Sequence, residues 1–220
     1  MTATRKRTRR NADDAKRVIL DAAEARLARS GPGGLRLQDI AADIGLSHPV
    51  ILHHFGSREG LLNALNARTI SQLKSAMHAV LDQATSPRRE LIDQVLDNVF
   101  SAFDGGLAQR VAWLGADADN PPGSMSRALS DIVDLIHGGR LIYAERVGGA
   151  LPDPEDSRML AFMVTTIAMG NAIFGAQLLG TTSPANHTAQ LNHFKAWLAR
   201  NIQFYLQASM IDALPSDLPD

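Results

Sequence analysis

Three histidines stand close together in the sequence and are the first residues to test for chemistry. His48, His53 and His54 lack the i, i+4 spacing that places two imidazoles on one helix face, and no carboxylate completes a ligand set. We therefore predict no metal site. The chain also shows no nucleophile motif, no phosphate-binding glycine loop and no paired histidine–carboxylate spacing. The residues predict a protein that is not an enzyme and needs no cofactor.

The histidines lie within residues 37–55, whose spacing predicts two short helices joined by a tight turn. Ala41 is small enough for a second helix to cross closely, and Gly45 follows the last turn, where a left-handed conformation costs glycine least. Ser47 can cap the second helix, and Ile51 then faces back into the core. These features predict a helix-turn-helix, with an ordinary helical corner as the alternative.

Nearly all of the remaining sequence also predicts helix, and no segment shows the alternation of a strand. Proline, glycine and capping residues divide the chain into nine predicted helices. Their expected ranges are 11–30, 37–44, 48–54, 58–84, 87–103, 107–117, 124–147, 154–179 and 184–211. The fold class is therefore predicted to be all-α, and the first helix supplies a third apolar surface for the helix-turn-helix.

Charge is divided unevenly along the chain, although the net charge is only −1. Residues 1–68 hold 12 Lys and Arg against 7 Asp and Glu, and the remainder holds 10 against 16. A basic head on an acidic body indicates that only the head approaches a polyanion. The absence of cysteine excludes disulfides and thiolate metal sites and is consistent with a reducing cytoplasm.

The helix-turn-helix segment carries a longer pattern of residues. It contains Ile40-Ala41-x-x-x-Gly45-Leu46-Ser47, followed by Ile51-x-His53-His54-Phe55-x-Ser57-Arg58-Glu59-x-Leu61-Leu62. With these residues, the segment from about 15 to 65 resembles the DNA-binding head of the TetR family of bacterial regulators. Leu52 departs from the family pattern, in which a tyrosine often contacts the DNA backbone, and Arg58 replaces the usual lysine.

The resemblance implies that the second helix of the motif enters the major groove of double-stranded DNA. His48, Pro49, Val50 and His53 would then face the bases, and His54 and Arg58 would flank the groove, with Arg58 adding charge to a helix N-terminus. The full set of expected DNA-binding residues is Arg36, Gln38, Ser47, His48, Pro49, Val50, His53, His54 and Arg58. Adjacent helical positions diverge, so His53 and His54 cannot both face DNA equally.

The family also implies an arrangement of domains: an N-terminal three-helix head and a larger helical domain for ligand binding and dimerisation. We expect a flexible basic arm over residues 1–10, the DNA-binding domain over 11–60, the larger domain over 61–212 and a tail over 213–220. A homodimer through the last two helices would match a palindromic operator. An unknown small-molecule effector would release the DNA.

Candidate effector-pocket residues are apolar or weakly polar side chains on the middle helices. They are Met77, Phe100, Phe103, Trp113, Tyr143, Met163, Thr166, Met169, Asn171 and Phe174. Each is also compatible with an ordinary core position. Thr166 and Asn171 are distinctive because buried polar groups need partners.

The overall expectation is a cytoplasmic, nucleoid-associated transcriptional repressor. An activator or a ligand-independent regulator of the same fold is an alternative, as is an all-helical enzyme or carrier. Met159 to Gly180 contains no charged residue and is long enough to cross a bilayer. Its polar residues and the lack of a basic or aromatic anchor after it favour a helix buried in a protein or dimer, so no membrane partner is expected.

Overall fold

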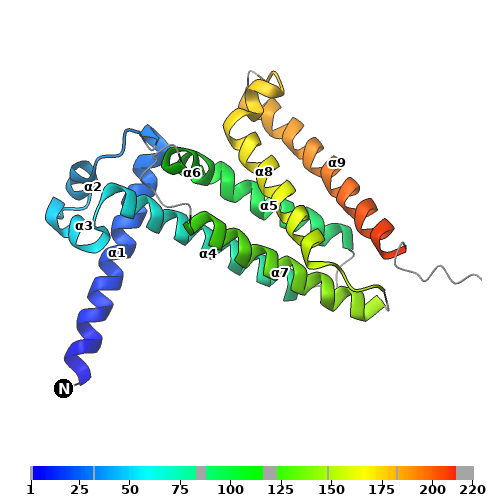
Figure 1. Cartoon of the computed structure of the whole chain (residues 1–220). Helices are drawn as coiled ribbons and strands as arrows, with labels where there is room; N and C mark the ends of the chain where they lie inside the picture. The colour runs from blue at the N-terminus through cyan, green and yellow to red at the C-terminus, as the bar shows by residue number, and fades with distance from the viewer. Residues whose placement is uncertain are drawn as a thin grey trace, which may run out of the picture. The chain divides into compact units, whose positions relative to one another are not determined.

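A computed structural model of the chain describes the backbone of residues 2–31, 33–82, 88–115, 123–147, 149–181 and 183–211 (Figure 1). Side chains are described for residues 12–31, 33–80, 90–114, 130, 132–142, 144–145, 149–181 and 183–208. The predicted all-α fold is confirmed, because the described residues form helices and include no strand. The expected tail and the predicted start of the helix at residue 87 lie outside them.

The described helices follow the predicted order closely. They are α1 (Thr2–Ser30), α2 (Leu37–Asp43), α3 (His48–Phe55), α4 (Arg58–Asp82), α5 (Arg88–Ala102), the π-helical turn η1 (Phe103–Leu107), α6 (Ala108–Gly115), α7 (Gly123–Val147), α8 (Pro154–Leu178) and α9 (Pro184–Ile211).

One boundary differs from the sequence prediction. Helix α1 begins at Thr2, so it includes residues that we expected to form a flexible arm. No glycine or proline interrupts residues 2–30, and lysine, arginine and alanine are good helix formers, so the helix extends back to Thr2. The predicted break at residues 104–106 is confirmed: Gly105 and Gly106 have non-helical backbone angles, with φ of 94° at Gly106, and the chain kinks there before α6 begins.

The chain divides into two compact units, and the division falls inside α4. The first unit comprises Met1–Thr69 and Gln109–Pro122, and the second comprises Ile70–Ala108 and Gly123–Asp220. The first unit contains the expected head over residues 11–60 together with more of α4 and with α6.

One apolar core holds the first unit together. It draws buried side chains from each of these helices, among them Ile19 of α1, Ile40 of α2, Ile51 of α3 and Leu61 of α4. Burying each such side chain contributes roughly 1.5–3 kcal/mol. Helix α2 contacts both α1 and α3, so these helices form the predicted three-helix arrangement.

The second unit is a bundle in which α5 contacts α8 and α9, and α7 contacts α8. Phe100 and Phe103 fill its core, together with Leu96 and Leu107. Helix α8 begins at the predicted residue with a side-chain cap: the Asp153 carboxylate accepts a hydrogen bond of 3.1 Å from the backbone N–H of Glu155.

Helix α8 is the one described helix that is long and apolar enough to cross a membrane, by length and composition alone. Its most apolar 18-residue window has a mean hydropathy of 1.7, and 17% of that window is buried. The low burial means that much of the apolar surface of α8 faces outward in a single chain.

Candidate nucleic-acid interface and ligand cavity

The turn between α2 and α3 has the geometry that the sequence predicts. Gly45 adopts φ of 66°, and the backbone N–H of Leu46 donates to the carbonyl of Ala41 at 2.9 Å, which closes the turn. Ser47 occupies the N-cap position with extended backbone, as predicted, but its side chain makes no capping hydrogen bond. The exposed Ser47 hydroxyl is therefore not used in capping α3.

The inner face of the motif is packed as expected. Ile51 has no exposed surface, and Ala41 and Ile40 are buried against it in the same core. Phe55 is half-buried and packs against the edge of that core. These contacts fix which face of α3 is left for an external partner.

The predicted DNA-binding residues fall into two groups by exposure. The exposed group is Arg36, Gln38, Ser47, Pro49 and His53, and the half-buried group is His48, Val50, His54 and Arg58. Helix α3 contains no acidic residue. The outer face of the motif thus offers hydrogen-bonding and apolar groups with no carboxylate from α3 among them.

The adjacent histidines are held in different environments. Their rings lie 5.5 Å apart in an edge-to-face arrangement, with His53 exposed and His54 half-buried beside Phe55. Burial, followed by the nearby His53 and Lys16, lowers the pKa of His54. This environment favours the neutral, hydrogen-bonding form of His54 over the cation.

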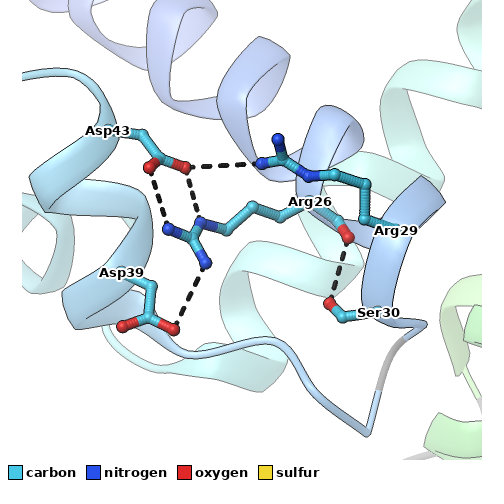
Figure 2. A network of polar contacts seen from close by, with 5 residues as sticks. All are labelled: Arg26, Arg29, Ser30, Asp39 and Asp43. Carbon is cyan, nitrogen blue, oxygen red and sulfur yellow. Dashed lines mark hydrogen bonds and ion pairs between the residues drawn. The ribbon is translucent and has the colours of Figure 1, made fainter.

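A network of charged side chains neutralises the acidic residues of α2 (Figure 2). Arg26 of α1 donates two hydrogen bonds to Asp43, at 2.5 and 2.8 Å, and one to Asp39 at 3.3 Å. Arg29 lies 3.8 Å from the Asp43 carboxylate. The Arg26 hydrogen bond holds the pKa of Asp43 below its ordinary value. This network ties α2 to α1 and keeps both carboxylates paired.

Arg58 has a packing role that sequence reasoning did not anticipate. Its guanidinium lies 4.3 Å from the centre of the Trp113 ring on α6 and donates a hydrogen bond of 3.1 Å to the carbonyl of Gly33. A cation stacked on tryptophan is stabilised by the electron-rich ring face. The start of α4 is thereby joined to α6 and to the loop after α1, through residues too far apart in sequence to be paired by pattern.

Arg110 of α6 is a second charged residue that the sequence did not single out. It is 2% exposed, and it donates to the Asn66 side chain at 2.7 Å and to the Thr69 hydroxyl at 2.8 Å. Burial lowers the pKa of the guanidinium. These bonds satisfy a buried charge and attach α6 to α4 within the first unit.

The second unit contains a cavity of about 380 Å³. Its walls come from α4, α5, α7, α8, α9 and the loop before α8. The lining residues are Met77, Leu91, Ile92, Val95, Leu96, Val99, Ile132, Ile136, Gly139, Arg140, Ala144, Ala150, Leu151, Pro152, Asp153, Asp156, Leu160, Ala161, Val164, Thr165, Ile202 and Leu206. The volume falls within the range of about 300–1,000 Å³ that is usual for small-molecule pockets.

Among the predicted pocket residues with described side chains, Met77 lines this cavity and the others lie elsewhere. Phe100 and Phe103 are buried in solid core, and Trp113 belongs to the first unit. Met163, Thr166 and Phe174 are exposed on α8, Met169 and Asn171 are half-buried, and the side chain of Tyr143 is outside the described set. Asn171 has a buried Nδ2 that finds no hydrogen-bond partner among the described residues, so its amide remains a polar group of interest.

Two lining residues of the cavity, Arg140 and Asp156, belong to a polar network. Arg140 donates to Asp156 at 2.6 Å and to the hydroxyl of Ser157 at 2.7 Å. The Tyr205 hydroxyl donates to the other Asp156 oxygen, a bond that raises the pKa of Tyr205. His137 lies 3.0 Å from the Ser157 hydroxyl. Arg140 and Asp156 are therefore paired within the protein.

Large apolar side chains are exposed along α8 and α9. On α8 they include Phe162, Phe174 and Leu178, the last of which is 80% exposed. On α9 they include Trp197 and Phe204, which is 74% exposed. A single chain thus leaves large apolar side chains of both helices in contact with water.

This chain is similar to known proteins in both sequence and fold. Residues 19–65 match the sequence model of the "Bacterial regulatory proteins, tetR family". The HTH-type transcriptional regulator BetI of Stenotrophomonas maltophilia (strain R551-3) is 34% identical over 76 residues, which cover 34% of this chain. The match spans 38% of the length of that curated relative.

Solved structures share the fold over most of the chain. A TetR-family protein from Mesorhizobium loti MAFF303099 has a TM-score of 0.63 at 21% identity, covering 86% of this chain and 95% of its own. A TetR transcriptional regulator from Legionella pneumophila has a TM-score of 0.56 at 22% identity, covering 82% of this chain and 95% of its own.

The fold and the first unit thus define an all-helical protein with an N-terminal helix-turn-helix and a larger helical domain. The predicted resemblance to the TetR family is confirmed, with the sequence match lying over α1 to α4 and the likeness of fold extending over the second unit.

Proposed function

We propose that this chain is a cytoplasmic, homodimeric transcriptional repressor of the TetR type, which binds a palindromic operator and leaves it when a small molecule binds the second unit. The observation that carries the proposal is the outer face of α3. That face is exposed and contains no acidic residue. The opposite face of α3 is packed against the core of the first unit through Ile51.

The exposed residues are the ones we assign to DNA. Gln38 and His53 can hydrogen-bond to base edges, and Pro49 can contact a thymine methyl group. Arg36 and the Ser47 hydroxyl suit phosphate oxygens. We assign Arg58 to positioning α4, because its guanidinium is already engaged by Trp113 and Gly33.

Two features of the second unit support the proposal of a dimer and an effector. The exposed apolar surface of α8 and α9 would be removed from water by the same surface of a second copy, which two-fold symmetry allows. The cavity of about 380 Å³ offers space for an effector. An effector that binds better to the conformer unable to fit the operator would shift the population away from DNA.

The test is fluorescence anisotropy of labelled DNA from the region upstream of the protein's own gene, titrated with salt. We expect His53→Ala to weaken binding by about tenfold, since a lost base contact costs roughly 1–3 kcal/mol. His78→Ala is the matched control, because His78 is an exposed histidine of α4 in the second unit. Equal affinity of all three proteins, or no preference over unrelated DNA, would contradict the proposal.

A further inference from the structure

We infer that the cavity of the second unit takes a neutral, mainly aliphatic molecule with a single hydroxyl or carbonyl end. The inference rests on the proposed function only in calling this molecule the effector. The chemical class follows from the charges and side chains of the cavity wall.

Most of the wall is aliphatic. Helices α4, α5, α7 and α8 contribute aliphatic side chains such as Met77, Val95, Ile136, Leu160 and Val164. The described lining residues include no aromatic ring. Aliphatic walls bind by removing apolar surface from water, without the ring stacking that favours planar aromatic ligands. A saturated chain is therefore the best match to this surface.

The charged residues of the wall disfavour an anion. Arg140 is the one cation among the described lining residues, and it already pairs with Asp156 at 2.6 Å. Both side chains are largely buried, at 15% and 20% exposed. The carboxylate of Asp153, another lining residue, is engaged in capping α8 through the backbone N–H of Glu155. A ligand carboxylate would have to share the Arg140 guanidinium with Asp156, which would place two negative charges beside one cation in a largely buried wall.

The same residues disfavour a cation. An alkylammonium group would have to lie beside the positively charged Arg140 guanidinium. The Asp156 and Ser157 oxygens that could accept its hydrogen bonds already accept hydrogen bonds from Arg140. A hydroxyl or carbonyl group needs no counter-charge, and the Thr165 hydroxyl on the wall can donate to it or accept from it. A neutral polar end is consequently the one that this wall accepts without breaking a pair.

The experiment compares 1-decanol, decanoate and decyltrimethylammonium, which share a ten-carbon chain and differ in the charge of the head group. Binding to the full chain is measured at pH 7.5 by calorimetry and thermal shift, below the micelle concentration. We expect 1-decanol to bind at least tenfold more tightly than either ion. Equal or tighter binding of decanoate, or no binding of any of the three, would overturn the inference.

Asp156→Asn removes the carboxylate that pairs with Arg140 and should change which head group the cavity prefers. Without the carboxylate, Arg140 is left to pair with a ligand, so decanoate should gain at least tenfold relative to 1-decanol. An unchanged ratio of the two affinities would refute the role that we give to the Arg140–Asp156 pair. The ratio is informative even if the variant is less stable, because both ligands are measured on the same protein.

Two substitutions on α5 locate the ligand. Val95→Phe fills the cavity and should weaken 1-decanol binding at least tenfold, whereas Gln94→Phe adds the same ring at an exposed position outside the lining and should change it less than twofold. Equal effects would place the ligand elsewhere. Operator binding is measured separately without any ligand, so a protein that binds 1-decanol selectively but no DNA would refute the proposed function and leave the ligand class standing.

Discussion

Gly60 is the position at which one added methyl group should most directly disturb the motif. It lies in the first turn of α4 and faces the end of α3. A Cβ atom at Gly60 would lie 2.0 Å from the carbonyl oxygen of Phe55, whereas real Cβ atoms essentially never approach within 3.0 Å. The obstacle is backbone, so Gly60→Ala must separate the end of α3 from the start of α4 by about 1.0 Å.

The expected cost combines two opposing effects. Forcing an extra methyl group into a packed site costs roughly 1–3 kcal/mol. Alanine recovers about 1 kcal/mol over glycine in a helix. Because the clash with Phe55 is severe, we expect Gly60→Ala to lower the free energy of unfolding by about 1–2 kcal/mol net, which corresponds to a fall in Tm of roughly 2–8 °C.

The matched control is Gly138→Ala in α7, where an added Cβ meets no atom of the described residues within 4 Å. This variant should be more stable than wild type by up to about 1 kcal/mol, from helix propensity alone. Urea unfolding and operator anisotropy are measured for both variants. If Gly60→Ala were as stable as Gly138→Ala and bound DNA like wild type, the close approach of α3 and α4 would have no energetic consequence.

Three further predictions concern the contacts of the two units. Arg58→Ala and Trp113→Leu should show a coupling free energy of about 0.5–2 kcal/mol in a double-mutant unfolding cycle, and additive effects would refute the cation–π contact. Because Arg26 lowers the pKa of Asp43, its stabilisation is present above the ordinary value near 3.8 and is lost as pH falls through the folded-state pKa. Asp43→Asn should therefore flatten the acid limb of urea unfolding between pH 5 and about pH 3, and an unaltered limb would contradict this. Phe204→Glu, at a position 74% exposed in one chain, should convert a dimer to a folded monomer in analytical ultracentrifugation, and an unchanged mass would exclude this surface.

The helix-turn-helix was predictable because its determinants are local. Gly45 needs a left-handed conformation, and Ala41 and Ile51 lie at the spacing that turns both toward a common core. Each of these requirements is met within a few residues of the chain. The same is true of the Ser57 cap of α4, whose hydroxyl accepts the backbone N–H of Gly60 at 3.0 Å.

The cavity was not predictable, because periodicity separates buried from exposed positions but does not distinguish a filled core from an empty one. Phe100 and Phe103 are buried as their pattern indicates, yet they fill space instead of bordering it. Thr166 was a candidate for its polarity and is exposed, while the neighbouring Thr165 lines the cavity. A shift of one residue turns a helix by about 100°, which sequence pattern does not resolve for a helix apolar on most sides.

The long-range pairs of the first unit also explain how the motif tolerates its own acidic residues. Asp39 and Asp43 lie on α2, beside the surface that we assign to DNA, where unpaired carboxylates would repel phosphates. Arg26 and Arg29 reach them from α1, so one set of contacts both fixes the position of α2 and removes uncompensated negative charge. The basic character of the head is therefore only partly available to DNA. Arg26 forms ion pairs within the protein. The residues that can contact phosphate are those, such as Arg36, that are exposed and show no ion pair among the described residues.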